Sequence, residues 1–366
     1  MSKKYLHLFV IFALLLSACA QAAQSPTPPG EASTSATTQT ATPAYSRVLK
    51  VMTHSSFAVS EDVVAAFEKA NDTRVQFIDA GDTGTALNKA ILSKDNPLAD
   101  VFYGVDNTFL SRALREGIYE PYKSPLLADI PDQFKLDPTD NALPVDYGDV
   151  CPNYDKAYFT QHNLTPPQNL EDLAKPQYKG LLVVENPATS SPGLAFLLAT
   201  IGHFGQDKYL DYWKSLVAND VQVVNDWNVA YYTDFTVHGG TRPIVISYGS
   251  SPPAEVVFSK TPLSEPPTGV ITADESCFRQ IEFVGILKGT PNKDLAEKWV
   301  DFMLSPTFQD DMPLQMFVFP VNKNAKLPEV FSKFLVIPKQ TAQVSPQEIA
   351  DNREKWLEAW TQTVLH

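Results

Sequence analysis

Apolar residues beyond the N-terminal segment recur with two alternating spacings. Residues 48–52, 74–78 and 99–104 are short apolar runs of the length of a strand. Between them, residues 61–71 and 83–93 carry apolar side chains three or four positions apart, as on one face of a helix. This alternation predicts a parallel sheet covered by helices on both faces. In such sheets the loops at the carboxyl ends of the strands form the ligand site.

The same alternation returns after residue 180 and predicts a second lobe. Two further apolar runs, residues 144–148 and 278–285, are interpreted as the crossings between the lobes. A final amphipathic helix is expected at residues 346–365, and the pattern does not fix the lobe on which it packs. The predicted parts are lobe 1 at residues 47–145 with 278–335, lobe 2 at residues 146–277, and a C-terminal segment at residues 336–366.

The N-terminus reads as an export signal. Two lysines and an apolar run at residues 5–16 precede Leu-Ser-Ala-Cys, which ends at Cys19. The run is shorter than the roughly 20 residues that a membrane-spanning helix needs, so residues 1–18 are predicted to be a signal peptide. Leu-Ser-Ala-Cys resembles the bacterial lipobox, in which the cysteine is acylated. An ordinary signal peptide that ends near a cysteine is the alternative.

Residues 19–46 consist mainly of Ser, Thr, Pro, Ala and Gln. Such a segment buries too little apolar surface to offset its ordering entropy. It is therefore predicted to be a disordered linker between a lipid on Cys19 and the folded part. The predicted location is the outer face of the cell membrane, or its periplasmic side.

The charge of the chain restricts its partners. The sequence has 29 basic and 42 acidic residues, and residues 1–18 contain two of the lysines and no acid. The mature protein therefore has 27 basic and 42 acidic residues, a formal charge of −15. This balance argues against nucleic acid or an anionic membrane surface as partner and permits a cationic ligand. Contact with the membrane is expected through the lipid only.

Cysteine and histidine usage points away from a metalloenzyme. Besides Cys19 the chain has Cys151 and Cys277, and an even pair in an exported protein predicts a disulfide. Two free buried thiols are the alternative. The six histidines show no metal-ligand spacing, and no nucleophile elbow, H-E-x-x-H motif or phosphate-binding loop is present. We therefore expect no metal, no cofactor and no enzymatic activity. A surface adhesin is disfavoured because it would need no paired loops at strand ends.

Several stretches carry a family resemblance. They are THSSF at residues 53–57, ADVFYGVDN at 99–107, PVDYG at 144–148, TSSPGL at 189–194 and VISYGSSP at 245–252. In this order and spacing the chain resembles the substrate-binding proteins of ABC importers, in particular their thiamine-binding branch. The resemblance implies a type II periplasmic-binding-protein fold, in which two lobes, each a mainly parallel sheet flanked by helices, enclose a ligand cleft. It also implies delivery of thiamine, or its phosphates, to a permease with its ATPase. We expect a monomer.

The resemblance also implies ligand contacts. Thiamine has a flat aminopyrimidine and a cationic thiazolium, which suit aromatic faces and carboxylates. His54 and Phe317 stand where the family usually has a tyrosine and often a tryptophan. Each aromatic could instead belong to the core. The residues predicted to bind ligand are His54, Asp82, Thr83, Asp106, Asp146, Ser190, Ser191, Trp227, Tyr248, Gly249, Ser250, Ser251 and Phe317.

Two helix starts refine the choice of ligand. Ser190-Ser191-Pro192 is typical of a helix N-terminus, where free amides can bind an anion or hydroxyl oxygen, although most such sequences are plain caps. Asp82 begins another helix, and its carboxylate would repel a phosphate, so we hypothesise a preference for thiamine over its phosphates. The alternative ligands are ferric iron, held by Tyr231 and Tyr232, and a polyamine.

Overall fold

The computed structural model describes residues 45–366. The signal peptide predicted for residues 1–18, the predicted acylation site Cys19 and nearly all of the linker predicted for residues 19–46 lie outside this range. No helix within residues 45–366 is long and apolar enough to cross a membrane.

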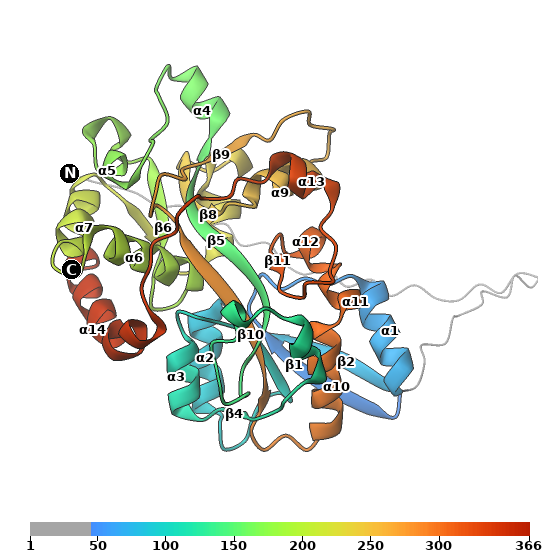
Figure 1. Ribbon diagram of the computed structural model, residues 1–366. Helices are drawn as coiled ribbons and strands as arrows, with labels where there is room; N and C mark the ends of the chain where they lie inside the picture. The colour runs from blue at the N-terminus through green and yellow to red at the C-terminus, as the bar shows by residue number, and fades with distance from the viewer. Residues whose placement is uncertain (1–44) are drawn as a thin grey trace, which may run out of the picture. The chain divides into compact units, whose positions relative to one another are not determined.

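Within these residues one eleven-stranded sheet connects two lobes (Figure 1). In lobe 1, β1 pairs in parallel with β2 and β3. In lobe 2, β6 pairs in parallel with β7 and β8. The antiparallel pair β5 and β10 lies between these groups. The strands are β1 (Arg47–Thr53), β2 (Thr73–Asp79), β3 (Val101–Asp106), β4 (Tyr119–Glu120), β5 (Leu143–Asp155), β6 (Leu182–Glu185), β7 (Gln222–Val224), β8 (Ile244–Tyr248), β9 (Thr268–Val270), β10 (Phe278–Leu287) and β11 (Phe319–Pro320).

Helices flank the sheet in both lobes, as the alternating pattern predicts. Those of lobe 1 are α1 (Glu61–Asn71), α2 (Thr83–Leu92), α3 (Leu110–Glu116), α10 (Lys293–Leu304), α11 (Pro306–Gln309) and α12 (Met312–Gln315). Those of lobe 2 are α4 (Lys156–Gln161), α5 (Leu170–Leu173), α6 (Ser191–Phe204), α7 (Tyr209–Ala218), α8 (Trp227–Val229) and α9 (Ser251–Phe258). The last part of lobe 1 adds α13 (Glu329–Phe334), and the C-terminal segment adds α14 (Pro346–Val364).

The chain after α10 forms two short helices rather than one continuous helix. These are α11 and α12, which are separated at Asp310 and Asp311. Pro313 lies in the first turn of α12 and has no N–H to donate to the carbonyl group four residues earlier. Because proline is tolerated in the first turn of a helix, the chain begins a new helix there.

β5 and β10 pass from one lobe to the other and contain the two crossings predicted at residues 144–148 and 278–285. β5 pairs with β10 over its first part and with β8 over its last part. β10 in turn pairs with β3 of lobe 1. Figure 1 shows the two strands side by side through the middle of the folded part.

The predicted disulfide between Cys151 and Cys277 is confirmed. Cys151 lies in β5 and Cys277 directly precedes β10, so the bond joins the two crossing strands near lobe 2. Nearby, the guanidinium of Arg279 donates two hydrogen bonds of 2.9 Å to the carboxylate of Asp149. The crossing strands are therefore connected by side chains as well as by the backbone ladder.

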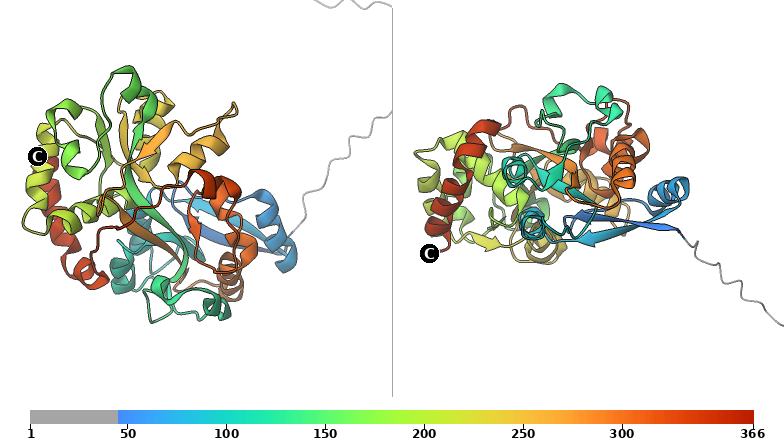
Figure 2. Two further views of the ribbon diagram at one scale, coloured as in Figure 1. Left: turned by 45° about the horizontal axis from the view of Figure 1, so that its top comes forward. Right: turned by 90° about the horizontal axis from the view of Figure 1, so that it is seen from below.

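The C-terminal helix α14 contacts both lobes. Its Trp360 packs edge-to-face on Trp213 of α7, with ring centroids 5.4 Å apart. Its buried Arg353 lies 4.3 Å from the centre of the Phe109 ring, directly before α3. Figure 2 shows α14 alongside α7 at one edge of the folded part. The sequence pattern did not fix the lobe on which this helix packs, and the structure shows that it packs on both.

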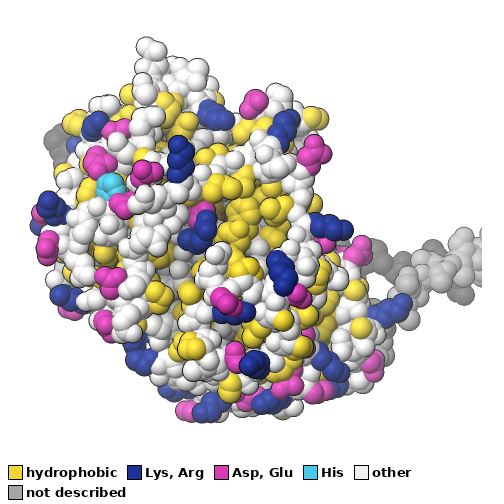
Figure 3. Space-filling model, in the orientation of Figure 1, with side chains coloured by type: hydrophobic (Ala, Val, Ile, Leu, Met, Phe, Trp, Pro, Cys, Tyr) yellow, Lys and Arg dark blue, Asp and Glu magenta, His cyan; other side chains and the backbone are white. Residues whose placement is uncertain are grey.

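Apolar side chains gather on one face near β11 and α13 (Figure 3). Beneath this face Phe317, Phe319 and Phe331 form a small core that is separate from the main core, and the half-buried Tyr147 and Leu335 pack against it. This small core borders the cleft between the lobes, because Phe317 also lines the cavity described next.

Candidate ligand-binding site

A cavity of about 440 Å³ lies between the lobes. The loops after β1 and β2 supply its lobe 1 wall, and residues that follow β7 and β8 supply its lobe 2 wall. These are carboxyl ends of parallel strands, as the pattern predicts. Most residues predicted to bind ligand line this cavity: His54, Asp82, Thr83, Ser191, Trp227, Tyr248, Ser250, Ser251 and Phe317.

The other four predicted residues are buried behind the cavity wall. Asp106 accepts hydrogen bonds from the amides of Thr108 and Phe109 and so caps the turn after β3. Asp146 accepts a hydrogen bond of 2.6 Å from the Tyr103 hydroxyl. The remaining two, Ser190 and Gly249, directly precede residues that do line the cavity.

Two loops of lobe 1 present polar atoms to the cavity. Asp82 is the N-cap of α2, and its carboxylate accepts hydrogen bonds from the amides of Thr83 (2.7 Å) and Trp227 (3.2 Å). Burial raises the pKa of Asp82. The amide of Ser56 donates to Nδ1 of His54 (3.2 Å), which places the ring proton on Nε2. Burial lowers the pKa of His54, so this ring is neutral at neutral pH.

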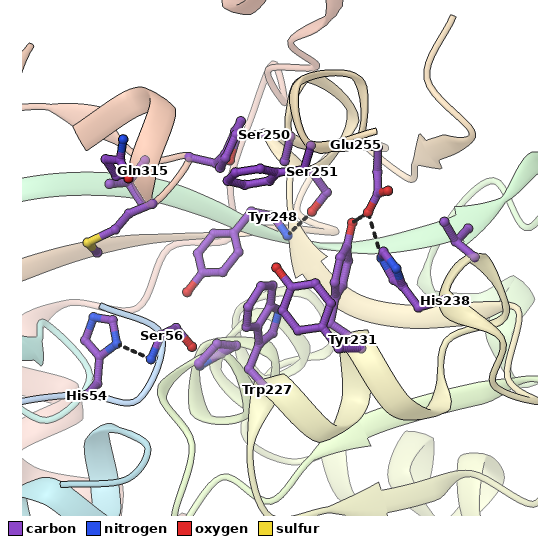
Figure 4. A pocket seen from close by; sticks show the side chains of 18 of the residues that line it. His54, Ser56, Trp227, Tyr231, His238, Tyr248, Ser250, Ser251, Glu255 and Gln315 are labelled. Carbon is purple, nitrogen blue, oxygen red and sulfur yellow. Dashed lines mark hydrogen bonds and ion pairs between the residues drawn. The ribbon is translucent and has the colours of Figure 1, made fainter. Parts of the chain in front are cut away.

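Aromatic rings form much of the lobe 2 wall (Figure 4). Trp227 stacks on Tyr231 with centroids 4.9 Å apart and planes 18° apart. The indole N–H of Trp227 donates to the hydroxyl of Ser247 (3.1 Å), which fixes the plane of the ring. Tyr248 lies 6.2 Å from Trp227, edge-on, and its hydroxyl donates to Gln280 (2.8 Å). The rings are thus held in place before any ligand enters.

Phe317 reaches the cavity from an unusual backbone conformation. Its φ angle is 55°, in the left-handed region that bulky residues rarely adopt. Its ring is stacked on Phe331 (6.0 Å) and meets Phe258 edge-on (4.8 Å), and both contacts hold the conformation. Strain of this kind costs about 1–3 kcal/mol and gathers at functional sites.

The N-terminus of α6 meets the cavity as the Ser-Ser-Pro pattern predicts. Ser190 is the N-cap, although its side chain makes no cap hydrogen bond, and its hydroxyl has no partner within the described residues. The hydroxyl of Ser191 accepts a hydrogen bond of 2.9 Å from Gln280, which also holds Tyr248. A residue of the crossing strand β10 therefore connects two parts of the lobe 2 wall.

Glu282 of β10 lines the cavity floor, and the sequence did not reveal it. It is only 6% exposed, and burial raises its pKa to about 8. One carboxylate oxygen lies 3.3 Å from Nε2 of His54 without good hydrogen-bond geometry, and the other lies 3.3 Å from the Tyr103 hydroxyl. The sequence around Glu282 predicts a buried crossing strand, and this pattern gives no sign that one of its side chains faces a cavity.

Glu255 of α9 is the second acid that the sequence did not reveal. Its carboxylate accepts a hydrogen bond of 2.7 Å from the Tyr231 hydroxyl and lies 2.9 Å from Nε2 of His238. Lys260 also lines the cavity. Figure 4 shows this group on the side opposite to His54, so the cavity has polar groups at two ends and aromatic rings between them.

The lobes touch directly beside the cavity. The side chain of Asn228 in lobe 2 bonds the hydroxyls of Ser55 (3.2 Å) and Ser56 (3.3 Å) in lobe 1. The amide of Gly84 donates to the carbonyl of Thr189 (2.9 Å). Together with the hydrogen bond from the Trp227 amide to Asp82, these contacts join the two lobes and close the cleft on this side of the cavity.

Of the two tyrosines considered for iron, Tyr231 is engaged in other contacts. Tyr231 donates its hydroxyl proton to Glu255 and stacks on Trp227. Burial and Glu255 raise its pKa well above the usual range, which opposes the tyrosinate that ferric iron requires. Within residues 45–366 no three His, Cys, Asp or Glu side chains are grouped to hold a metal ion.

Residues 96–339 match the family of bacterial extracellular solute-binding proteins. The thiamine-binding periplasmic protein of Escherichia coli (strain K12) is 30% identical over 324 residues, which cover 87% of this chain and 93% of that protein. The thiamine-binding periplasmic protein of Brucella suis biovar 1 (strain 1330) is 31% identical over 319 residues, 85% of this chain and 90% of that protein.

Solved structures agree with the observed fold. A periplasmic thiamin binding protein has a TM-score of 0.76 at 28% identity and covers 87% of this chain and 96% of its own. A ferric binding protein from Campylobacter jejuni has a TM-score of 0.69 at 20% identity over 86% of this chain and 99% of its own, which indicates the shared fold alone. The two-lobed type II fold implied by the sequence is confirmed, and the chain belongs to the family of bacterial extracellular solute-binding proteins.

Proposed function

We propose that this protein captures thiamine between its lobes, outside the cytoplasm, and delivers it to the permease of an ABC importer. The observation that carries the proposal is the cavity wall, which combines fixed aromatic rings with buried carboxylates. The relatives that match nearly the whole folded part are named as thiamine-binding proteins, which supports the same ligand here.

The aromatic rings suit a flat, cationic heterocycle. Trp227 and Tyr248 present surfaces at different angles to the same space, and Phe317 borders it from the lobe 1 side. A planar ring gains from offset stacking on such surfaces. A fixed cation over an aromatic face gains about 0.5–2 kcal/mol. Aromatic walls therefore serve both halves of thiamine.

The charges at the cavity favour a cation. Asp82, Glu255 and Glu282 line it, whereas Lys260 is the one Lys or Arg side chain among its described lining residues. The two histidines of the lining are His54, which is neutral at neutral pH, and His238 beside Glu255. A cationic ligand compensates the carboxyl groups of Asp82 and Glu282, neither of which has a Lys or Arg partner among the described residues.

The position of Asp82 supports the preference for thiamine over its phosphates. The bond from Gly84 to Thr189 brings the start of α2, capped by Asp82, against the loop before α6. A phosphate bound at the amides of α6 would then lie near the carboxylate of Asp82. Repulsion between them weakens phosphate binding.

Titration calorimetry with the mature protein in detergent tests the proposal. We expect one thiamine to bind per chain, and a hundredfold excess over Kd to stabilise the fold by about 2.7 kcal/mol. Thiamine monophosphate and diphosphate are expected to bind more weakly. The screen also contains ferric iron, polyamines and the pyrimidine half of thiamine. A polyamine or iron that binds tightly while thiamine does not would overturn the proposal.

We also propose that Cys19 carries a lipid that retains the protein at the membrane. The lipobox-like sequence that ends at Cys19 supports this, and so does the Ser/Thr/Pro-rich composition of the linker. A tether of this length keeps the binding protein at a high effective concentration near the permease. Stable retention takes more than one acyl chain, as a lipoprotein anchor provides.

A further inference from the structure

The Tyr103 hydroxyl lies between two carboxyl groups at the floor of the cleft. It is 2.6 Å from Oδ2 of Asp146 and 3.3 Å from Oε2 of Glu282. The two acids are direct partners in the ladder between β5 and β10. Asp146 is fully buried, whereas Glu282 faces the cavity. The crossing strands thus hold an acid pair that opens to the ligand through one member.

The hydrogen-bond contacts favour a proton on this pair. A tyrosine hydroxyl donates one proton, and the short contact assigns it to Asp146. The contact with Glu282 is then favourable only if a carboxyl proton points back at the hydroxyl oxygen. Burial raises the pKa of Glu282 to about 8 and raises that of Asp146 well above its usual range, so the pair retains a proton at neutral pH.

The groups around the pair do not neutralise it. Asp82 at the start of α2 and Asp106 at the end of β3 add negative potential at Glu282. The ring of His54, after β1, is neutral, and the Tyr248 hydroxyl of β8 is bonded to Gln280. The buried Arg353 of α14 acts on Asp106 from behind the cavity. A positive charge at Glu282 has to come from the ligand.

Resting on the function proposed above, we propose that Glu282 recognises the positive charge of a bound thiamine, and that the acid pair of Glu282 and Asp146 releases its shared proton as the ligand binds. The carboxyl O–H bond breaks, the electron pair remains on the carboxylate, and the proton goes to solvent. The thiazolium cation then takes the place of the proton as the charge that balances the pair. Glu282 thereby selects a cationic ligand over a neutral one of the same shape.

Any proton released on binding at pH 7 comes from the protein and not from thiamine, so the number of protons released tests the proposal. The thiazolium charge is permanent, and the aminopyrimidine is neutral at pH 7, so a released proton comes from the protein. Linkage then requires that thiamine affinity rises about tenfold per pH unit as pH increases toward the Glu282 pKa of about 8, and that it levels off above that pH.

Calorimetry of thiamine binding in phosphate and in Tris, whose ionisation enthalpies differ, counts the protons released. For the wild-type protein at pH 7 we expect close to one proton per thiamine. Glu282→Gln should release none, and its weaker binding should no longer depend on pH between 6 and 8. Glu358→Gln, which removes an exposed carboxylate of α14, is the matched control and should behave as the wild type.

The outcomes separate this inference from the proposed function. Failure of the wild-type protein to bind thiamine would overturn the function itself. Binding without proton release in the wild type would leave the function intact and overturn the acid-pair proposal, even if Glu282→Gln does not fold. A Glu282→Gln variant that still releases one proton would overturn the assignment to Glu282.

Discussion

The amide of Gly84 and the carbonyl oxygen of Thr189, 2.9 Å apart, join the two lobes backbone to backbone. A Cβ atom on residue 84 would lie 2.5 Å from the carbonyl oxygen of Ala188, closer than such atoms approach. Glycine is therefore required in the first turn of α2 for this closed arrangement, and the rim of the cleft depends on a residue that touches no ligand.

Gly84→Ala is expected to weaken thiamine binding by at least about tenfold, which corresponds to the loss of about 1.4 kcal/mol from one hydrogen bond and a steric conflict. The helix itself should not suffer, because alanine has a better helix propensity than glycine. Calorimetry gives the affinity, and the thermal midpoint of the ligand-free variant controls for folding. Unchanged affinity would mean that this contact does not form in the bound state.

Removal of the disulfide is expected to affect stability more than affinity. Cys151 and Cys277 are 126 residues apart in sequence and do not line the cavity. A bond that closes so long a loop stabilises by about 2–5 kcal/mol. Urea unfolding of the double serine variant should show a loss of this size with thiamine affinity changed less than about threefold. Wild-type protein under reductant should match the variant, and a large loss of affinity in both would contradict the prediction.

Trp227→Ala is expected to weaken thiamine binding about 10- to 100-fold. The change removes a stacking face and the indole N–H that bonds Ser247. Trp227→Phe keeps a ring and should recover part of the affinity. Tyr232→Phe, which alters a half-exposed ring beside Trp227, is the control for a non-specific effect of substitutions in the cavity wall on affinity. Equal affinities for all three variants would place the ligand elsewhere in the cavity.

The ligand-free protein is expected to lose stability as pH rises above 6.5. Buried acids have pKa values raised in the folded state, to about 7 for Asp106 and about 8 for Glu282. The folded state therefore holds their protons more tightly than the unfolded state, and this contribution disappears as pH rises through those values.

His54 acts in the opposite direction but only below its ordinary value of 6.5, so the window from pH 6.5 to 8.5 isolates the acids. Thermal unfolding across this window should show a falling midpoint, with a smaller fall in Glu282→Gln. Asp146 and Glu185, whose pKa values burial also raises, account for the part that remains. A midpoint that rises with pH would contradict the sign.

Cys19→Ser is expected to release the protein from the membrane fraction without change in thiamine affinity. The altered site is outside the described residues, whereas the described residues that line the cavity all belong to the folded part. Fractionation of cells that express the variant, with immunodetection, measures the distribution. Retention of the variant at the membrane would indicate an anchor other than a lipid on Cys19.

Local patterns predicted the regular elements well. α1 has both ends expected from its apolar spacing, because a helix that covers a sheet shows its buried stripe in the sequence. The loops at strand ends followed from the parallel topology, whereas the ligand-binding roles of His54, Asp82 and Trp227 were implied by the family resemblance. Short elements such as α9, α13 and β11 escaped, because their form depends on contacts far away in the chain.

Glu282 and Glu255 show what a single sequence hides. Glu282 lies in β10, whose side chains are buried on both faces, so no alternation distinguishes a residue that faces a cleft from one that faces the core. Glu255 follows two prolines in α9, and only the fold brings it to Tyr231 and His238. The acidic composition of the chain also made single carboxylates uninformative.

α14 packs on α3 of lobe 1 and on α7 of lobe 2, so the two lobes are also connected by a helix that does not line the cavity. If the lobes move apart to admit or release the ligand, the contacts of Trp360 with Trp213 and of Arg353 with Phe109 have to change. The energy of that adjustment enters the equilibrium between open and closed forms and hence the apparent affinity. Substitutions at these α14 contacts can therefore change how readily the protein releases its ligand, although the residues do not line the cavity.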